Sequence, residues 1–367
     1  EILRCLVGSE MCIRDRYDRE TDLTYWEEDP EAAVKALNTC YTYLGNMDEQ
    51  LYCEAMTDNA YTKQPNDATQ NIGNGSYSTA DPYVKKVWDG RYTGIRMCNE
   101  LLENIDRVPD LDPELKKRYI GEAKVLRAYN YYELYTKFGD VPYTTKVLSI
   151  KESMSIARTA KATVIANVLA DLDEVINGNY LPTSYDADNK GRITRWAAMA
   201  IKAKIYLFEG NWTQVKNITS TIMTEGGFKL FGSYAGLFEI ANEYNSEVIL
   251  DAQYRPTSRE HQMMYVFLPP TLGGYSQLSP LQELVDSYIM LDGKTIKETG
   301  TSFDESHPYA NRDPRLKATV MYTGNSYTLA DGTEVVINCE KGEGKDGYGV
   351  GSDCSATGYY IKKYWDN

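Results

Sequence analysis

Few side chains in this sequence have the types and spacing that catalysis requires. The acidic cluster 27–29 (Glu-Glu-Asp) could supply the paired carboxylates of a glycoside hydrolase. Such a pair is defined by a separation of about 5–10 Å in space, which a sequence does not show. The two histidines, His261 and His307, both lie in predicted loops, so a Ser-His or Cys-His nucleophile system is not favoured. We therefore predict no catalytic residues and no enzyme activity.

Two short motifs resemble ligand-binding loops but lack the necessary context. Residues 342–347 match G-x-G-x-x-G, yet no strand leads into the motif and no helix follows it to receive a phosphate. Residues 186–191 resemble part of a calcium loop, but Ala197 occupies the position that needs a bidentate glutamate. The seven cysteines include no C-x-x-C pair, so a zinc site is not expected. The sequence predicts neither a metal site nor a cofactor.

Aromatic residues in two loop-like regions, 58–81 and 259–280, are better candidates for ligand contact. A sugar ring has an apolar face that can lie on an aromatic ring, and its hydroxyls need amide or charged partners. Both regions lack a helical or strand period, so their rings are not explained by helix packing. The alternative is that these rings pin the loops onto a scaffold. The predicted ligand-binding residues are Tyr61, Asn74, Tyr77, Tyr265 and Tyr275.

Composition narrows the class of partner. A formal net charge of −14 and a pI near 4.8 argue against nucleic acid and against an anionic membrane surface, because both reward dense Lys and Arg. No run of 18 or more apolar residues occurs, so no transmembrane helix is expected within the chain. Tyrosine outnumbers phenylalanine 31 to 7, and most of these rings are expected to pack helices with the hydroxyl near water.

Helix-start signals divide the first part of the chain into helices. Pro30, Pro82 and Pro113 each follow an aspartate, which gives an N-cap followed by proline at the first helical position. The last two helices of this part, joined by a short turn with Gly and Trp, resemble a tetratricopeptide unit. The predicted helices span approximately residues 30–45, 82–105, 113–138, 163–176, 194–209 and 213–224.

The helix within 113–138 is tyrosine-rich and amphipathic. Tyr131 and Tyr135 lie on one apolar stripe and are expected to be buried, and Gly139 and Pro142 end the helix. The opposite positions are polar and are expected to face away from the core. These positions are Arg127, Asn130, Glu133 and Lys137. The segment is therefore predicted to be packed scaffold.

After residue 226 the pattern changes to short apolar runs broken by proline and glycine. A short helix is predicted over 281–288, a hairpin over 327–337 and a strand-like run over 359–365. The fold class is mainly α, with tetratricopeptide-like helix pairs packed against an irregular loop-rich region that has a few short strands. The helical scaffold spans about 30–225, and the ligand-facing part comprises about 58–81 and 226–367.

Ordered blocks recur along residues 26–367. The blocks include Trp88 with Cys98-Asn99, Gly121-Glu122-Ala123, Phe138-Gly139-Asp140-Val141-Pro142, Asn242-Glu243, Asp292-Gly293, Arg312-Asp313-Pro314-Arg315-Leu316, and Gly358 with Lys362 and Tyr364. In this order they resemble the SusD/RagB-like glycan-binding outer-membrane lipoproteins of Bacteroidetes. The resemblance implies a protein at the cell outer membrane that captures oligosaccharides without cleaving them and delivers them to a TonB-dependent transporter. It also implies a lipid anchor, which is expected to be missing from this chain.

The two ends of the chain depart from this resemblance. Residues 1–16 have neither an apolar signal-peptide core nor a helical period and are predicted to be a non-native segment. Residues 17–367 are interpreted as a single SusD-like domain truncated at both ends. Two alternatives remain for the function: a glycoside hydrolase, or a helical-repeat protein that binds only protein partners.

Overall fold

The computed structural model describes residues 22, 24–45, 47–63, 68–255, 257, 259–261, 263–329 and 331–365. The chain divides into two compact units. Unit 1 comprises residues 1–44 and 88–222, and unit 2 comprises residues 45–87 and 223–367. The predicted non-native segment 1–16 lies outside the described residues.

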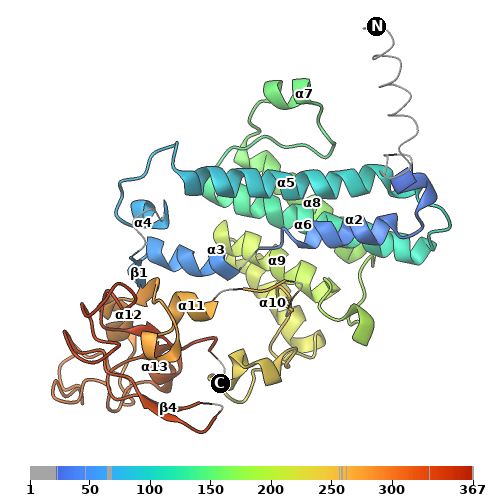
Figure 1. The fold of residues 1–367 in the computed structure, drawn as a ribbon. Helices are drawn as coiled ribbons and strands as arrows, with labels where there is room; N and C mark the ends of the chain where they lie inside the picture. The colour runs from blue at the N-terminus through green and yellow to red at the C-terminus, as the bar shows by residue number, and fades with distance from the viewer. Residues whose placement is uncertain are drawn as a thin grey trace, which may run out of the picture. The chain divides into compact units, whose positions relative to one another are not determined.

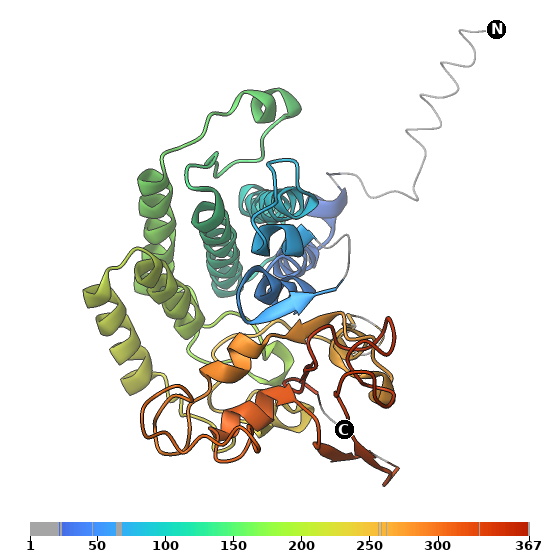
Figure 2. The same ribbon diagram turned by 90° about the vertical axis from the view of Figure 1, so that its left-hand side faces the viewer.

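Unit 1 is helical, and every helix that the sequence predicts in this part of the chain is confirmed. The helix α5 begins within the sequence range of unit 2 and continues into unit 1. Helix α6 packs against α2, α8 and α9, and these helices lie side by side (Figure 1 and Figure 2). The elements are a short π-helix η1 (Thr24–Glu28), α2 (Ala32–Tyr41), α5 (Pro82–Asn104), α6 (Pro113–Phe138), α7 (Ile150–Ser155), α8 (Lys161–Asn177), α9 (Arg195–Phe208) and α10 (Trp212–Glu225).

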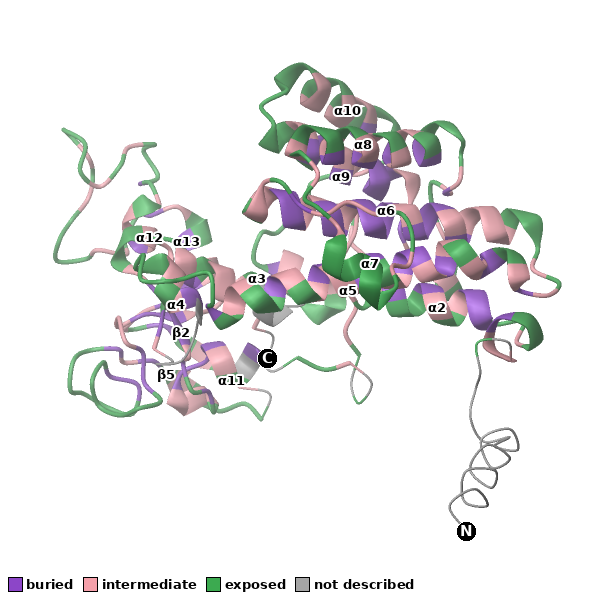
Figure 3. Ribbon diagram, turned by 90° about the horizontal axis from the view of Figure 1, so that it is seen from above, coloured by how far each residue is buried: buried purple, intermediate pink, exposed green. Residues whose placement is uncertain are grey.

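Helix α6 is the central element of unit 1. The Asp112 side chain accepts a hydrogen bond from the Leu115 N–H at 2.9 Å and caps the first turn, and Gly139 follows the last turn with φ 69°. Tyr131 and Tyr135 are each only 1% exposed, which confirms the predicted apolar stripe. Figure 3 shows buried residues along most of the length of α6, because other helices cover more than one of its faces.

The polar side of α6 corrects the sequence prediction. Arg127 and Asn130 were predicted to face away from the core, but they are 4% and 0% exposed. Arg127 donates to Asn99 of α5 at 2.8 Å and to Asp171 of α8 at 2.6 Å. A buried guanidinium is tolerated here because each partner satisfies part of its hydrogen-bonding capacity. Lys137 is exposed, as predicted.

Glu122, also on α6, is a fully buried carboxylate that joins several segments of unit 1. It accepts a hydrogen bond from the Tyr41 hydroxyl of α2 at 2.6 Å. Arg118 lies 3.1 Å from it on the same helix, and Arg192, just before α9, lies 3.2 Å away. Burial raises the pKa of the Glu122 carboxyl, whereas the Tyr41 hydrogen bond and the charges of Arg192 and Arg118 act in the opposite direction.

Unit 2 contains short elements separated by turns. The predicted short helix and hairpin are confirmed as α12 and the pair β4–β5, whereas the run 359–365 contributes only the two residues of β6. The elements are α3 (Met47–Tyr52), β1 (Ala60–Thr62), α4 (Ala68–Gly73), α11 (Met263–Phe267), β2 (Leu278–Pro280), α12 (Gln282–Ser287), α13 (Pro314–Thr319), β3 (Val320–Met321), β4 (Ser326–Thr328), β5 (Glu334–Val336) and β6 (Tyr360–Ile361).

The region 58–81 was predicted to be a long surface loop without regular structure, and this is wrong in part. It contains β1 and α4, and β1 pairs antiparallel with β2. The pairing joins residues more than 200 positions apart, since Ala60 faces Pro280 and Thr62 faces Leu278. Such a partner is not visible in local sequence, because a three-residue strand has no measurable period.

Buried polar side chains hold the turns of unit 2 in place. The Arg312 guanidinium donates to the backbone carbonyls of Val285 at 2.6 Å, Tyr288 at 2.8 Å and Pro308 at 2.9 Å. These three bonds satisfy carbonyls that have no partner in a regular helix or strand. Arg312 is 6% exposed, so it is an internal tie between α12 and the segment that precedes α13.

None of the described helices is both long enough and apolar enough to cross a membrane.

Replacing Glu122 by Ala is expected to destabilise unit 1 by about 3–5 kcal/mol, because it leaves the partly buried guanidinium groups of Arg118 and Arg192 without their buried carboxylate. Urea unfolding followed by far-ultraviolet circular dichroism measures the change. The matched control is Glu114→Ala in the exposed first turn of the same helix, which should cost less than about 1 kcal/mol. Equal losses in the two variants would contradict the role given to Glu122.

Candidate ligand-binding site

The residues considered first for catalysis have structural roles. Glu27 pairs with Arg107 at 3.0 Å, and Asp29 accepts from the Glu31 N–H at 2.9 Å beside α2. His307 is exposed, and its Nδ1 lies 2.9 Å from the carboxylate of the nearby Asp304. These contacts occur at a helix start and in surface turns, where such side chains commonly satisfy local backbone or charge.

The motif 186–191 contains a short 3₁₀ helix, Ala187–Asn189, and the motif 342–347 consists of turns. The Asp186 carboxylate accepts from the backbone N–H of Asn189 at 3.0 Å, and Asp346, inside the glycine-rich motif 342–347, accepts from the Thr271 N–H at 2.8 Å. Among the described residues, no group of three or more His, Cys, Asp and Glu side chains is placed to hold a metal ion. Both motifs therefore organise neighbouring turns through their carboxylates.

Tyr265 and Tyr275 form a pair of stacked rings on unit 2. Their centroids are 5.8 Å apart and their planes differ by 26°. The two residues are 54% and 45% exposed, so each ring keeps about half of its surface in water. Half-exposed, offset-stacked rings of this kind offer an apolar surface bordered by hydroxyls. We call these two residues the tyrosine pair.

The backbone positions the tyrosine pair. The Tyr275 N–H donates to the Tyr265 carbonyl at 2.7 Å, and the Gln277 N–H donates to the Val266 carbonyl at 2.6 Å. Gly274 makes the intervening turn possible, because a Cβ at this position would collide with the Leu268 carbonyl. Since the turn folds back tightly, the two rings meet without any direct side-chain hydrogen bond being required.

Tyr61 projects from β1 and is 38% exposed. Its neighbours Ala60 and Thr62 are buried, as expected for side chains that alternate along a strand. The Tyr61 hydroxyl accepts a hydrogen bond from Gln70 of α4 at 2.7 Å. This bond orients the ring at the surface, so Tyr61 remains a candidate for ligand contact.

Asn74 and Tyr77 follow α4 in the same part of unit 2. The Asn74 side-chain oxygen Oδ1 accepts from the Ser76 N–H at 3.0 Å and from the Ser76 hydroxyl at 2.6 Å, so this oxygen stabilises the turn. Tyr77 is 55% exposed, and its N–H donates to the Asn71 carbonyl at 3.1 Å. Tyr77 therefore presents a ring to water, whereas Asn74 has a local structural role.

The strand pair β1–β2 joins the segment that carries Tyr61 to the segment that follows Tyr275. Tyr61 faces Ser279, which follows Tyr275 by four positions. Because an extended chain spans at most about 3.6 Å per residue, the Cα atoms of Tyr275 and Ser279 are at most about 14 Å apart. The structure thus brings Tyr265 and Tyr275 into contact and places Tyr61 in the adjoining sheet. Among the residues described, no side-chain hydrogen bond or ring contact joins Tyr61, Asn74 or Tyr77 to the tyrosine pair.

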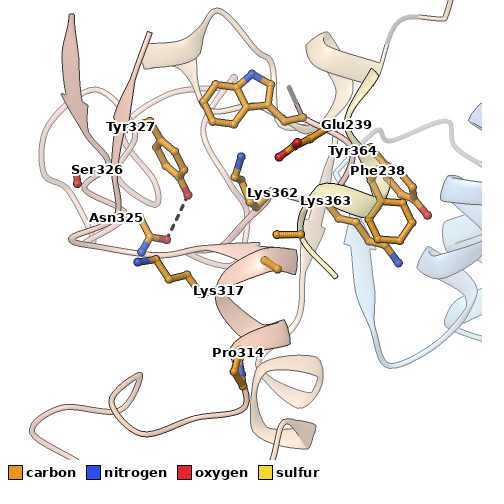
Figure 4. A pocket seen from close by; sticks show the side chains of 13 residues that line it. Phe238, Glu239, Pro314, Lys317, Asn325, Ser326, Tyr327, Lys362, Lys363 and Tyr364 are labelled. Carbon is orange, nitrogen blue, oxygen red and sulfur yellow. Dashed lines mark hydrogen bonds between the residues drawn. The ribbon is translucent and has the colours of Figure 1, made fainter. Parts of the chain in front are cut away.

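A recess that the sequence did not predict lies elsewhere in unit 2 (Figure 4). Its walls come from four segments, 235–239, 314–318, 325–327 and 362–365, and none of the five predicted residues lines it. The lysines and aromatics of 362–365 are visible in the sequence, but nothing local indicates which distant segments they meet.

Comparison with protein families identifies the chain. A family model described as "Starch-binding associating with outer membrane" matches residues 31–207, and a second, described as "SusD family", matches residues 237–367. The chain belongs to the SusD family. The resemblance drawn from the sequence blocks is therefore confirmed, and so is the mainly helical fold with its tetratricopeptide-like packing.

Individual SusD-like proteins resemble this family member over much of its length. A SusD-like protein of Formosa agariphila is 30% identical over 251 residues, which is 61% of this chain and 47% of that protein. A SusD-like carbohydrate-binding protein of Bacteroides fragilis has a TM-score of 0.83 at 25% identity, covering 94% of this chain and 69% of that one. The chain spans about half the length of the curated relatives it matches.

The fold also matches a surface glycan-binding protein of Bacteroides thetaiotaomicron solved with laminarihexaose. The TM-score is 0.66 at 18% identity, and the match covers 91% of this SusD-family chain and 70% of that protein.

Replacing Gly274 by Ala is expected to displace the turn that carries Tyr275 and to destabilise the protein by about 1–3 kcal/mol, because the new methyl group overpacks against the Leu268 carbonyl. Thermal unfolding measures the loss. Gly232→Ala is the matched control, since a Cβ there meets nothing within 4 Å. A Gly274→Ala protein as stable as Gly232→Ala would show that the turn is less crowded than described.

Proposed function

We propose that this protein captures oligosaccharides at the outer-membrane surface without cleaving them and delivers them to a TonB-dependent transporter. Membership of the SusD family and the likeness to a carbohydrate-binding protein of Bacteroides fragilis support the glycan as ligand. The transporter and the lipid anchor follow only from what the family resemblance implies.

The observation that carries the proposal is the tyrosine pair. Tyr265 and Tyr275 expose about half of their surface, and short backbone hydrogen bonds together with the ring stacking hold them beside each other without a ligand. An ordered surface loses little conformational entropy on binding, which favours a ligand that offers only the weak apolar face of a sugar ring. Gln277, whose side-chain amide donates to the Tyr275 carbonyl at 3.4 Å, adds a polar group beside the rings.

Tyr61 and Tyr77 extend the proposed surface beyond the tyrosine pair. Both rings are exposed, and Tyr61 is oriented by Gln70. Several separated rings suit a chain of sugars better than a single sugar, because each ring can support one unit. We infer that the ligand is an oligosaccharide and that Asn74 contributes mainly by shaping the turn that leads to Tyr77.

Replacing Tyr265 or Tyr275 by Ala should weaken glycan binding by about 0.5–1.5 kcal/mol per ring beyond the loss of buried area, or about twofold to tenfold in the dissociation constant. A glycan array that includes laminarihexaose selects the ligand, and calorimetry measures the affinity. Tyr348→Ala, which removes a ring that is 41% exposed in another loop of unit 2, is the control. If all three variants bound equally well, the tyrosine pair would not be the site.

The enzyme and protein-binding alternatives make different predictions. Purified protein incubated with the glycans it binds is expected to produce no new reducing ends. A bound glycan present at 100 times its dissociation constant should stabilise the fold by about 2.7 kcal/mol and raise the melting temperature. New reducing ends would identify a glycoside hydrolase, and a melting temperature that no glycan changes would favour a protein that binds only protein partners.

A further inference from the structure

A second recess of unit 2 shares two lining residues, 363 and 364, with the recess in Figure 4. Its volume is about 210 Å³. This is below the range of about 300–1,000 Å³ that is usual for ligand pockets, but above the roughly 150 Å³ in which an engineered apolar cavity holds benzene. The space therefore suits a single small ring. We call it the Leu278 pocket, and its lining includes Ala60, Tyr234, Leu278, Tyr288, Thr319 and Ile361.

The most buried part of the Leu278 pocket is apolar. Leu278 and Ala60 are buried, and they belong to the paired strands β2 and β1. Leu51 and Ile361, which also line the pocket, pack against the same buried cluster. A ligand group that reaches these side chains gives up its hydration, so a hydroxyl directed at them would lose hydrogen bonds without replacement. This surface therefore favours a hydrocarbon ring over a sugar ring, which carries hydroxyls around its edge.

Two tyrosine rings line the more exposed part of the Leu278 pocket. Tyr234 and Tyr364 are both exposed residues. Each ring packs edge to face on Phe238, with centroid distances of 5.7 Å for Tyr234 and 4.9 Å for Tyr364. The third ring thus holds the positions of the other two. An aromatic ligand that enters the pocket can make further edge-to-face contacts with them, whereas an aliphatic ligand cannot.

Thr319 adds a polar group to the lining of the Leu278 pocket. Its hydroxyl oxygen is buried, and no described residue forms a hydrogen bond of good geometry with it. The Tyr288 hydroxyl is close by, because burial raises the pKa of Tyr288 and the Thr319 hydroxyl acts in the opposite direction. A hydroxyl can both donate and accept a hydrogen bond. Thr319 therefore keeps the capacity to bind one polar group of a ligand.

The unpaired hydroxyl points to a ligand as well as to an apolar space. Buried polar groups in proteins are hydrogen-bonded with few exceptions, and an unpaired one destabilises the fold. A ligand hydroxyl that reaches Thr319 supplies the missing bond and offsets this cost. The required ligand thus combines a hydrocarbon ring, which Leu278 and Ala60 accommodate, with one hydroxyl.

We propose that the Leu278 pocket binds a phenol, that is, a single aromatic ring with one hydroxyl. The ring lies on Leu278 and Ala60 with an edge toward Tyr234, and the hydroxyl forms a hydrogen bond with Thr319. The phenol is either free or carried by a sugar as an aryl glycoside. The site goes beyond the function proposed above, because it recognises an aromatic ring rather than a sugar and does not include the tyrosine pair.

The test is calorimetric titration of the whole chain with 4-methylphenol, toluene, methyl glucoside and 4-hydroxyphenyl glucoside. 4-Methylphenol should bind, and methyl glucoside should not compete with it. Toluene should bind about twofold to tenfold more weakly than 4-methylphenol, because it leaves the Thr319 hydroxyl unpaired. Binding of 4-methylphenol alone supports a free phenol as ligand, and additional binding of 4-hydroxyphenyl glucoside supports a phenol carried by a sugar.

Two variants with matched controls locate the ligand. Thr319→Val should weaken 4-methylphenol binding by about twofold to tenfold and leave toluene binding unchanged, which a general loss of structure would not do. Its control is Thr213→Val on the exposed surface of α10. Tyr234→Ala should weaken the binding of both aromatic ligands by about twofold to tenfold. Tyr348→Ala, in another loop of unit 2, is its control.

The outcomes separate this proposal from the proposed function. The phenol site is overturned if 4-methylphenol does not bind, if toluene binds equally well, or if Thr319→Val and Tyr234→Ala bind 4-methylphenol as their controls do. Tyr275→Ala should leave 4-methylphenol binding unchanged. Loss of that binding would instead place the phenol at the tyrosine pair and would also overturn the proposal. Failure of the glycan array alone would affect only the proposed function.

Discussion

The buried carboxylate of Glu122 is the constraint on which the helical unit depends. An ionised group taken out of water costs several kcal/mol unless opposite charges and hydroxyls replace its hydration. The Tyr41 hydroxyl, Arg118 and Arg192 provide that replacement, and they come from three different parts of unit 1. Arg127 repeats the arrangement with the charges reversed, through Asn99 and Asp171. Helices tied by such buried groups cannot slide past one another without leaving a charge unpaired, so the ties specify helix register as well as contact.

Unit 2 has little regular structure, so helices and strands satisfy few of its backbone hydrogen-bonding groups. Single side chains replace the missing helices and strands there: Arg312 binds three carbonyls, and the Ser355 hydroxyl accepts from the N–H groups of Thr357, Gly358 and Tyr359 at 3.1–3.2 Å. Because a few side chains hold the backbone of unit 2, many of its other side chains need not pack in a core. Aromatic rings can then stay half exposed on an ordered backbone, which explains how an irregular segment presents defined surfaces.

Local signals predicted the helices well, because capping aspartates, N-terminal prolines and apolar stripes act within a few residues. The same reasoning failed on the polar face of α6, where Arg127 and Asn130 are buried since neighbouring helices cover that face too. It also missed α4 and β1, and β1 forms by pairing with Leu278, Ser279 and Pro280 far along the chain. The rings of Tyr265 and Tyr275 were selected by their lack of a helical period, but their stacking arises from the turn at Gly274. The recess in unit 2 shown in Figure 4 could not be predicted from the sequence, because four segments far apart in the chain build it.

In the segment between Tyr265 and Tyr275, the backbone sets the shape of the surface and the two side chains set its chemistry. The hydrogen bonds that join its two ends run between main-chain atoms, and its side-chain requirements include a glycine at position 274 and the Asp346 carboxylate that accepts from the Thr271 N–H. The identities of residues 265 and 275 are therefore not needed to build the loop. A lineage that keeps this glycine can exchange the two rings for other side chains and change what it binds in one or two substitutions. Ligand preference can therefore change by substitution while the backbone of this segment stays the same.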